Sequence, residues 1–370
     1  MKLDRRSFAR NLVAAAALIS SAGAIHAQGL AAADGGMRSG KVFTSTNGAA
    51  GNEVLAYGAG PGGALSLLAR YPTQGLGTSA GLGSQGAVML SNDGRWLFVV
   101  NAASNTVSTF TVRPAGLVLA SVVDSGGLHP ISISEREGLV YVLNDGGSGN
   151  VAGFLNHGGT LVAVAGSVRP LSAAGGTGPA QVSISPEGDL LVVTEKTTNR
   201  IVSYALASDG SAGAPLATAS AGITPFGFAF DRRGRIFVSE ANQSTLSSYR
   251  FEGATPVNIS AAVPTGQAAA CWAAVTPNGR YAYTGNAGTN SVSLFAIDRM
   301  GQATLAESAA ASTGTGGAGD IAIAGHGRTL NILAPRTPAI YAFGIEADGT
   351  LTPAAVATGL PAGVVGLAAN

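Results

Sequence analysis

The sequence predicts an all-β fold made of repeated four-stranded sheets. Residues 91–110 return as residues 276–295 with eight of twenty positions identical, and both copies contain a polar turn, an apolar strand, a second turn and a strand that ends in an aromatic residue. Charged residues make up only 11% of the 370 residues, while glycine occurs 54 times. This composition favours many short strands and turns over helices with charged faces.

Three kinds of predicted strand each occur seven times. The first is small and apolar, at residues 86–91, 130–134, 180–185, 226–230, 271–276, 320–324 and 363–368. The second follows a Gly-containing turn, at 42–46, 96–100, 140–143, 190–194, 236–239, 281–285 and 329–333. The third has an aromatic or large apolar centre, at 54–57, 107–110, 151–155, 201–204, 246–249, 292–295 and 340–343. A less regular fourth strand follows, as at 117–123, 161–168 and 351–357, and this repeat predicts a β-propeller of seven four-stranded blades.

The two ends of the repeat region predict how the ring closes. The first repeat begins on a second-strand motif at residues 41–44 with no first strand before it, and the chain ends on a spare first strand at 363–367. We expect these two strands to pair in one blade, because the single cysteine, Cys271, leaves no disulfide to do so. A tandem of two sandwiches is the alternative fold, but it does not explain a seven-fold count.

Residues 1–27 resemble an export signal. Residues 4–8, DRRSF, resemble a twin-arginine motif, residues 11–19 are apolar but too short to span a bilayer, and residues 25–27 fit a cleavage site. The alternative is an ordinary secretory signal with a chance arginine pair. Either route delivers a mature chain, residues 28–370, to the periplasm or the outside of the cell, and we expect no membrane span in it.

Charge and composition exclude several classes of partner. Four of the 21 basic residues and one of the 20 acidic residues lie in 1–27, so residues 28–370 carry a formal charge of −2. A near-neutral chain with 6% aromatic residues has no footprint for nucleic acid or anionic lipid. No two histidines share ligand spacing, and the glycine-rich runs precede strands and lack lysine. We therefore expect a monomer that takes a small-molecule ligand, with no metal and no cofactor.

The predicted site lies on one face of the propeller. Strand direction alternates within a blade, so the loop between the second and third strands opens on the same face as the link from the fourth strand to the next blade. This face collects His129, Asn144, Asp145, Glu195, Lys196, Glu240, Trp272, Asn286 and Asp320. We predict the site at the mouth of the central channel on this face. The acids of the opposite turns, such as Asp93 and Asp231, are interpreted as turn formers.

The blade turns at residues 185–188 and 276–280, followed by Leu-x-Val or Tyr-x-Tyr, resemble those of the lactonase family of seven-bladed propellers. That family includes propeller-type 6-phosphogluconolactonases and fungal carboxymuconate lactonising enzymes, and the resemblance covers essentially all of residues 28–370. The same turn also occurs in non-enzymatic propellers. The resemblance implies that His129 and Glu195 match two catalytic positions of the family. Ala180 and Gln181 replace its Arg-His pair, and Ala287 stands where another Arg is expected.

The missing cations change the expected ligand. A lactone that bears phosphate or several carboxylates needs cations to hold it, so a neutral or weakly charged ligand is expected. The hypothesis has Glu195 or His129 as general base or acid. The expected ligand-binding residues are Asn144, Asp145, Gln181, Glu240, Trp272, Asn286 and Asp320.

Structural alternatives stay open for the same residues. Glu195 and Glu240 occupy positions where other blades carry Asn, so both could cap the loop between strands two and three. His129 precedes Pro130 and could only satisfy a turn, and Asp320 could bond backbone amides between blades. The alternative function is a non-catalytic propeller that binds a protein or glycan through its loops.

Overall fold

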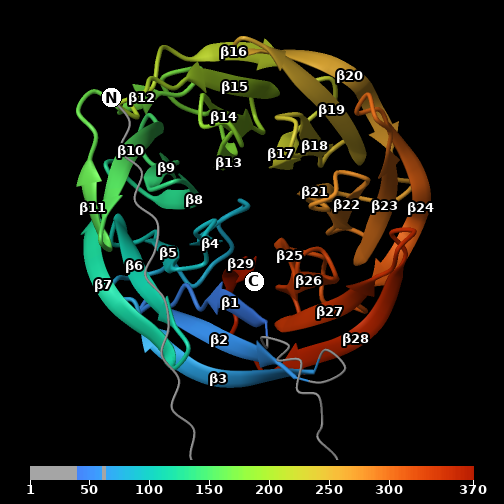
Figure 1. The fold of residues 1–370 in the computed structure, drawn as a ribbon, viewed down its shortest axis with the longest axis horizontal. Helices are drawn as coiled ribbons and strands as arrows, with labels where there is room; N and C mark the ends of the chain where they lie inside the picture. Colours follow the sequence, from blue (N-terminus) through green and yellow to red (C-terminus); the bar gives the residue numbers. More distant parts are fainter. Residues whose placement is uncertain (1–39, 61–63) are drawn as a thin grey trace, which may run out of the picture. The chain divides into compact units, whose positions relative to one another are not determined.

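The computed structural model describes residues 40–60 and 64–370 of the chain, and within them all regular structure is β-strand. The predicted export signal lies outside the described residues. Seven antiparallel sheets are arranged around a common axis (Figure 1), which confirms the predicted seven-bladed propeller.

Each blade begins at the axis and ends at the rim. From the axis outward, blade one contains β29 (Val365–Ala369), β1 (Lys41–Ser45), β2 (Glu53–Ala59) and β3 (Leu65–Pro72). Blade two contains β4 (Val88–Leu90), β5 (Trp96–Asn101), β6 (Thr106–Arg113) and β7 (Gly116–Asp124). Blade three contains β8 (Pro130–Arg136), β9 (Leu139–Asn144), β10 (Asn150–His157) and β11 (Thr160–Ala163), and β12 (Arg169–Pro170) also pairs with β10.

The other four blades repeat this order. Blade four contains β13 (Pro179–Ile184), β14 (Leu190–Glu195), β15 (Arg200–Ala205) and β16 (Leu216–Ala219). Blade five contains β17 (Pro225–Phe230), β18 (Ile236–Glu240), β19 (Thr245–Glu252) and β20 (Thr255–Pro264). Blade six contains β21 (Ala270–Val275), β22 (Tyr281–Asn286), β23 (Ser291–Ile297) and β24 (Ala303–Ser312). Blade seven contains β25 (Ile321–Ala324), β26 (Thr329–Ala334), β27 (Ala339–Ile345) and β28 (Leu351–Thr358).

The last strand of the chain closes the ring, as predicted. β29 pairs antiparallel with β1, with Phe43 opposite Ala368 and Thr44 opposite Leu367. The Lys41 N–H donates to the Asn370 side-chain oxygen at 2.8 Å, and the Asn370 N–H donates to the Lys41 carbonyl at 3.1 Å. The strand that begins blade one in space is therefore supplied by the end of the chain.

Apolar clusters fill every seam between neighbouring blades. Phe43 of β1 packs with Leu97 of β5 between blades one and two, and one larger cluster joins blades two, three and four. Separate clusters lie between blades four and five, five and six, six and seven, and seven and one. Burial of apolar surface in these seams is the main source of stability, since no disulfide is present.

The fourth strand of blade three differs from the predicted strand at residues 161–168. β11 ends at Ala163 and pairing resumes only at β12. Between them, the Ser167 hydroxyl donates to the Gly153 carbonyl and accepts from the Gly153 N–H, both at 3.0 Å. The Val164 N–H also donates to the Gly153 carbonyl at 2.9 Å, but the Gly153 N–H bonds a side chain instead of the main chain, so the strand is interrupted.

The first strand of blade two also differs from the prediction. Residues 86–91 were expected to form it, but β4 spans only Val88–Leu90. The residues before β4 leave the sheet and run to the centre of the ring, where Figure 1 shows the coil that precedes β4. This departure shapes the candidate site.

Candidate functional site

Residues 81–86, the axial segment, bond to the inner strands of three other blades. The Ser84 hydroxyl donates to the Ile131 carbonyl of β8 at 2.8 Å, and the Gln85 N–H donates to the Ala180 carbonyl of β13 at 3.0 Å. The Gln85 side chain reaches Ala273 of β21. The axial segment therefore occupies the space enclosed by the inner strands.

Two glutamine side chains bond the main chain of an inner strand in another blade, Gln85 from the axial segment and Gln181 from β13. Gln85 donates to the Ala273 carbonyl at 2.9 Å and accepts from the Ala273 N–H at 3.0 Å. Gln181, predicted to bind ligand, makes the same pair of bonds with Phe228 of the next blade, at 2.9 and 2.7 Å. Both side-chain polar atoms of Gln181 thus have partners within the protein.

A cavity of about 330 Å³ lies beside the axial segment. It opens among the starts of inner strands β21, β25 and β29 and the end of β26, which is the face predicted to carry the site. Its apolar walls are formed by Leu82, Leu333, Pro335 and Val364. Of the nine residues predicted for the site, Trp272 and Asp320 line this cavity.

Asp320 is the charged side chain of the cavity wall. Its carboxyl group accepts hydrogen bonds from the backbone N–H groups of Gly86, Ile321 and Gly366, and the residue is only 5% exposed. Burial raises the pKa of this carboxyl to about 7, although the three N–H bonds oppose the rise. Asp320 therefore bonds amides of neighbouring blades, as its structural alternative stated, and also faces the cavity with a carboxyl that titrates near neutrality.

Trp272 connects the cavity to the neighbouring blades. Its indole N–H donates to the Ser84 carbonyl at 3.1 Å, and its ring meets the Phe226 ring edge to face at 5.2 Å between centroids. The indole thus holds the axial segment with its polar edge and presents apolar surface to the cavity.

Lys196 is a mouth residue that was assigned to this face in the sequence but not to the site. Its ammonium group donates to the Gly83 carbonyl at 2.5 Å and to the Pro179 carbonyl at 2.9 Å, and it lies 5.1 Å from the centre of the Phe226 ring. Burial lowers the pKa of Lys196, while the nearby Asp145 carboxylate partly restores it. The one sequence signal for it was its place directly after Glu195.

The second strand of several blades ends in a polar side chain that forms hydrogen bonds with the adjacent loops. Five of these residues are fully buried: Asn101, Asn144, Glu195, Glu240 and Asn286. Glu195 accepts from the Ser172 N–H at 2.9 Å, from the Ser172 hydroxyl, and from the Thr198 hydroxyl at 2.5 Å. Both carboxylate oxygens are therefore engaged by loops of the protein.

The same kind of bonding within the protein is found at Glu240, Asn286 and Asn144. Glu240 accepts from the Thr245 hydroxyl at 2.5 Å and from the Gly222 N–H at 3.0 Å, and burial raises its pKa against these bonds. Asn286 donates to the hydroxyls of Ser291 and Ser293 at 3.2 and 2.9 Å. The Asn144 amide donates to Asn150 at 2.8 Å, while its own oxygen is buried with no partner among the described residues. None of these residues lines the cavity.

His129 and Asp145 lie at the mouth on blade three. His129 adopts a left-handed backbone conformation, with φ of 56°, and its N–H donates to the Asn105 side-chain oxygen at 2.7 Å. The Asp145 N–H donates to the His129 carbonyl at 3.0 Å, which ties the two residues together. Both are partly exposed. The predicted catalytic role of His129 stays a prediction.

Cys271 is a buried thiol and the single cysteine of the chain. It packs with Ala180 and Phe226 beneath the mouth. Burial raises the pKa of this thiol to about 12, although the Lys196 charge opposes the rise. A thiol that stays neutral at physiological pH acts as a packing group.

The described part of the chain has neither a metal-binding cluster nor a membrane-spanning helix. No group of three or more His, Cys, Asp or Glu side chains in residues 40–60 and 64–370 is arranged to hold a metal ion. The same residues contain no helix that could cross a bilayer.

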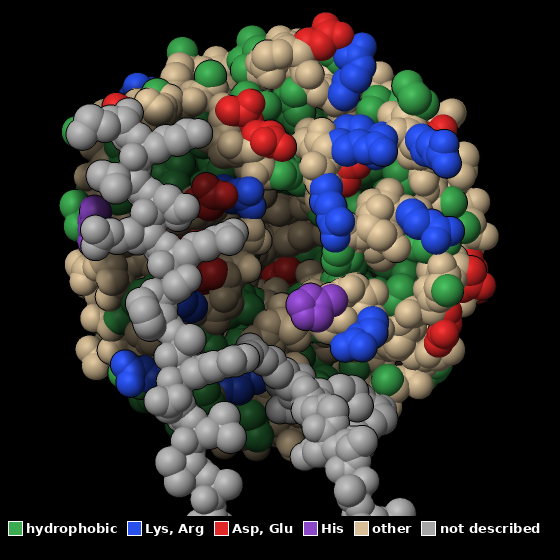
Figure 2. All heavy atoms as spheres, in the orientation of Figure 1, with side chains coloured by type: hydrophobic (Ala, Val, Ile, Leu, Met, Phe, Trp, Pro, Cys, Tyr) green, Lys and Arg blue, Asp and Glu red, His purple; other side chains and the backbone are tan. Residues whose placement is uncertain are grey.

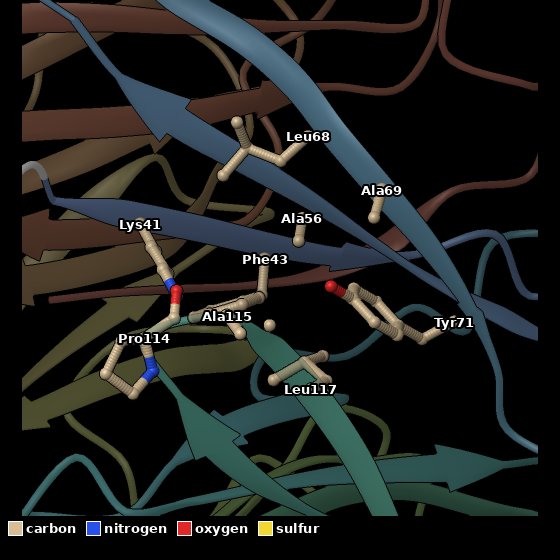
Figure 3. Close-up of a pocket in the computed structure, with 10 residues that line it drawn as sticks. Lys41, Phe43, Ala56, Leu68, Ala69, Tyr71, Pro114, Ala115 and Leu117 are labelled. Carbon is tan, nitrogen blue, oxygen red and sulfur yellow. The ribbon is translucent and has the colours of Figure 1, made fainter.

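A second and smaller pocket, of about 110 Å³, lies between the outer parts of blades one and two (Figure 3). Phe43, Leu68, Tyr71 and Leu117 line it, together with Lys41. The Lys41 ammonium donates to the Arg113 carbonyl at 2.9 Å and to the Pro114 carbonyl at 3.2 Å. This lysine joins two blades far from the axis, in the same manner as Lys196 at the mouth.

Charge is unevenly spread over the face opposite the mouth, where turns join first to second strands and third to fourth strands. On the face drawn in Figure 2, basic side chains gather over blades five and six, and Arg232, Arg233, Arg280 and Arg299 are exposed in the turns of these blades. The acids in equivalent turns bond their own backbone, as predicted. Asp93 accepts from the Arg95 N–H and Asp231 from the Arg233 N–H, both at 2.9 Å.

Comparisons with known proteins agree with the resemblance found in the sequence. The family model described as "Lactonase, 7-bladed beta-propeller" matches residues 156–256. The chain has no significant match among curated proteins. The predicted resemblance to lactonase propellers is confirmed over the matched residues.

Solved structures extend the comparison to the whole ring. A candidate 6-phosphogluconolactonase from Bacteroides uniformis is 20% identical, with a TM-score of 0.71, over 88% of this chain and 98% of that chain. The periplasmic gluconolactonase PpgL from Pseudomonas aeruginosa is 18% identical, with a TM-score of 0.69 and the same coverage. Apo AztD from Citrobacter koseri is 11% identical, with a TM-score of 0.58, over 90% of this chain and 98% of that chain. At these identities the likeness shows a shared fold.

Proposed function

We propose that the protein is an exported lactonase-type propeller that binds and hydrolyses a small, uncharged lactone in the cavity at the channel mouth. Asp320 is the proposed general base and Trp272 the apolar contact for the ligand. The observation that carries the proposal is a cavity beside the axis with apolar walls and one carboxyl that titrates near neutrality.

The size and lining of the cavity support a small ligand. Its volume of about 330 Å³ is at the lower end of the range for small-molecule sites, roughly 300 to 1,000 Å³. Trp272, Leu333 and Val364 supply apolar surface. No Lys or Arg is among the described residues that line the cavity, and an ionised Asp320 repels anionic groups, so phosphorylated or acidic sugar lactones are disfavoured.

The position of Asp320 supports acid–base chemistry. A carboxyl with a pKa of about 7 is partly ionised at neutral pH, which suits a group that takes up and returns one proton. Water adds to the lactone carbonyl carbon as its proton passes to Asp320. The ring C–O bond then breaks and the same proton goes to the ring oxygen, which leaves a hydroxy acid.

Two observations bear on the earlier choice of Glu195 and on export. Both carboxyl groups accept hydrogen bonds within the protein, but Asp320 lines the cavity and Glu195 does not, so Asp320 is the better supported base. Export is supported by the twin-arginine resemblance in residues 1–27 and by the likeness to a periplasmic gluconolactonase.

A panel of lactones tests the proposal. Uncharged γ- and δ-lactones and one phosphorylated sugar lactone are offered to the wild type and to the Asp320→Asn, Glu195→Gln and Asp298→Asn variants, with thermal unfolding as a check of folding. We expect turnover of uncharged lactones, a loss of roughly 100-fold or more in Asp320→Asn, and wild-type rates in the other two variants. A loss in Glu195→Gln with Asp320→Asn unaffected would move the base to Glu195. Absence of both binding and turnover in the wild type would reject the proposal.

The second candidate function is non-catalytic binding through the loops. The observation that favours it is that Glu195, at a catalytic position of the lactonase family, is fully buried and bonded within the protein. Saturable binding of an uncharged lactone without turnover would favour a small-molecule binder. Binding of a protein or glycan by a variant whose cavity is filled by Val364→Phe would favour loop recognition.

A further inference from the structure

We propose that residues 81–84 of the axial segment form a carbonyl-binding wall of the cavity, and that Lys196 is the positioning residue that holds this wall in place. The inference about the ligand carbonyl rests on the proposed function, whereas the inference about Lys196 stands on hydrogen bonds within the protein.

Backbone N–H groups in this wall have no acceptor of their own. Leu82 and Ser84 are buried, at 8% and 7% exposed, whereas Gly83 between them is exposed, and the N–H groups of Leu82 and Ser84 donate to no atom of residues 40–60 and 64–370. Buried backbone N–H groups are nearly always bonded, to water or a ligand where the protein supplies no partner. Gly83 has a left-handed φ of 59°, and successive N–H groups around such a residue form a concave site for oxygen atoms.

The carbonyl groups of the wall are held by other parts of the molecule. Lys196 donates to the Gly83 carbonyl, and the Trp272 indole donates to the Ser84 carbonyl. The carbonyl of one residue and the N–H of the next belong to one planar peptide unit, so the bond to the Gly83 carbonyl fixes the direction of the Ser84 N–H. The bond from the Lys196 ammonium group is charge-assisted, so it is stronger than the neutral bond from the Trp272 indole.

The wall and Asp320 line the same cavity, which is what hydrolysis of a lactone requires. Negative charge builds on the carbonyl oxygen as water adds to the carbonyl carbon, and preorganised N–H groups stabilise it. Asp320 takes the proton from the water. The ligand class follows from this pairing: an uncharged compound with one carbonyl group and an apolar remainder.

The chain offers a matched control for Lys196. Lys41 also donates to two backbone carbonyls of a neighbouring blade, at 2.9 and 3.2 Å, but beside the outer pocket shown in Figure 3. Lys196→Met and Lys41→Met therefore remove the same kind of bond at the axis and at the rim. Lys196→Arg keeps the charge and the donors.

The single cysteine reports on the wall without any ligand. Cys271 is buried and packs with Ala180, whose carbonyl accepts the Gln85 N–H of the axial segment at 3.0 Å. Removal of the Lys196 charge alone would raise the pKa of the thiol and slow its alkylation. Displacement of the axial segment would expose the thiol and speed its alkylation.

The test measures alkylation of Cys271 by iodoacetamide in the folded protein, beside lactone turnover. We expect Lys196→Met to speed alkylation tenfold or more and to lower kcat for an uncharged lactone by tenfold or more with little change in KM. Lys196→Arg and Lys41→Met should match the wild type in both assays. Alkylation of Lys196→Met at or below the wild-type rate would overturn the positioning role, whatever the lactones do. Faster alkylation with unchanged kcat would overturn the carbonyl-binding role, and absence of lactone binding by the wild type would instead count against the proposed function.

Discussion

The raised pKa of Asp320 predicts how the free energy of unfolding changes with pH, and this prediction does not depend on any ligand. Burial raises the pKa of this carboxyl from 3.8 to about 7 in the folded protein. The folded state therefore binds more protons than the unfolded state between these two pH values. Stability from a protonated Asp320 is fully present below pH 4 and is lost as the pH rises toward 7 and above.

The size of the effect follows from the shift. Three pKa units correspond to about 4 kcal/mol in the free energy of unfolding. In the Asp320→Asn variant the side chain keeps its volume but cannot ionise, so this pH dependence disappears. The difference in unfolding free energy between wild type and variant should change by up to about 4 kcal/mol from pH 4 to pH 8, in favour of the variant.

Urea denaturation of both proteins at unit steps of pH from 4 to 8 measures this difference. Asp298→Asn is the control, because hydrogen bonds from its own turn lower the pKa of the exposed Asp298 carboxyl and its contribution is lost as the pH falls. A constant difference between wild type and Asp320→Asn would refute the raised pKa. A difference that grows in favour of the wild type would show that the three N–H bonds outweigh burial.

Three other features of the ring carry predictions. Arg235→Ala should lower the free energy of unfolding by about 3 to 5 kcal/mol in urea titrations, because it leaves Asp231 buried without its 2.6 Å partner. Arg95→Ala in the exposed pair with Asp93 should cost less than about 1 kcal/mol, and equal losses would contradict this reasoning. Deletion of residues 365–370 should lower Tm sharply in thermal melts, since β1 loses its inner partner; an unchanged Tm would show that β29 does not close the ring. Gln85→Leu should cost about 3 kcal/mol in urea, because the buried N–H and carbonyl of Ala273 lose their partners, and a loss of less than about 0.5 kcal/mol would argue against this bond pair.

The fold could be predicted because its signals are local and periodic. A strand ending near residues 101, 144, 195, 240 and 286 recurs with the same turn before it, and the spare strand at the C-terminus matched the missing strand at the start. The same periodicity placed Asn144, Glu195 and Asn286 at equivalent positions. The structure shows why they are equivalent: each bonds the loops of its own blade.

The cavity could not be predicted because it depends on contacts between distant parts of the chain. The axial segment contains Gly, Ser and Gln before an apolar strand and reads locally as the start of that strand. Its true position depends on Ala180 and Ala273, which lie far along the chain. Lys196 was visible on the correct face, but its reach to Gly83 follows only from the three-dimensional arrangement.

The occupancy of the mouth cavity by an uncharged lactone is tested most directly by the fluorescence of Trp272. The chain contains two tryptophans, so Trp96→Phe leaves Trp272, on the cavity wall, as the single emitter. Titration of this variant with an uncharged δ-lactone should give a saturable change in emission that Asp320→Asn alters and that a phosphorylated sugar lactone does not reproduce. Emission that stays constant with the uncharged lactone, or that responds equally to the phosphorylated one, would contradict the account.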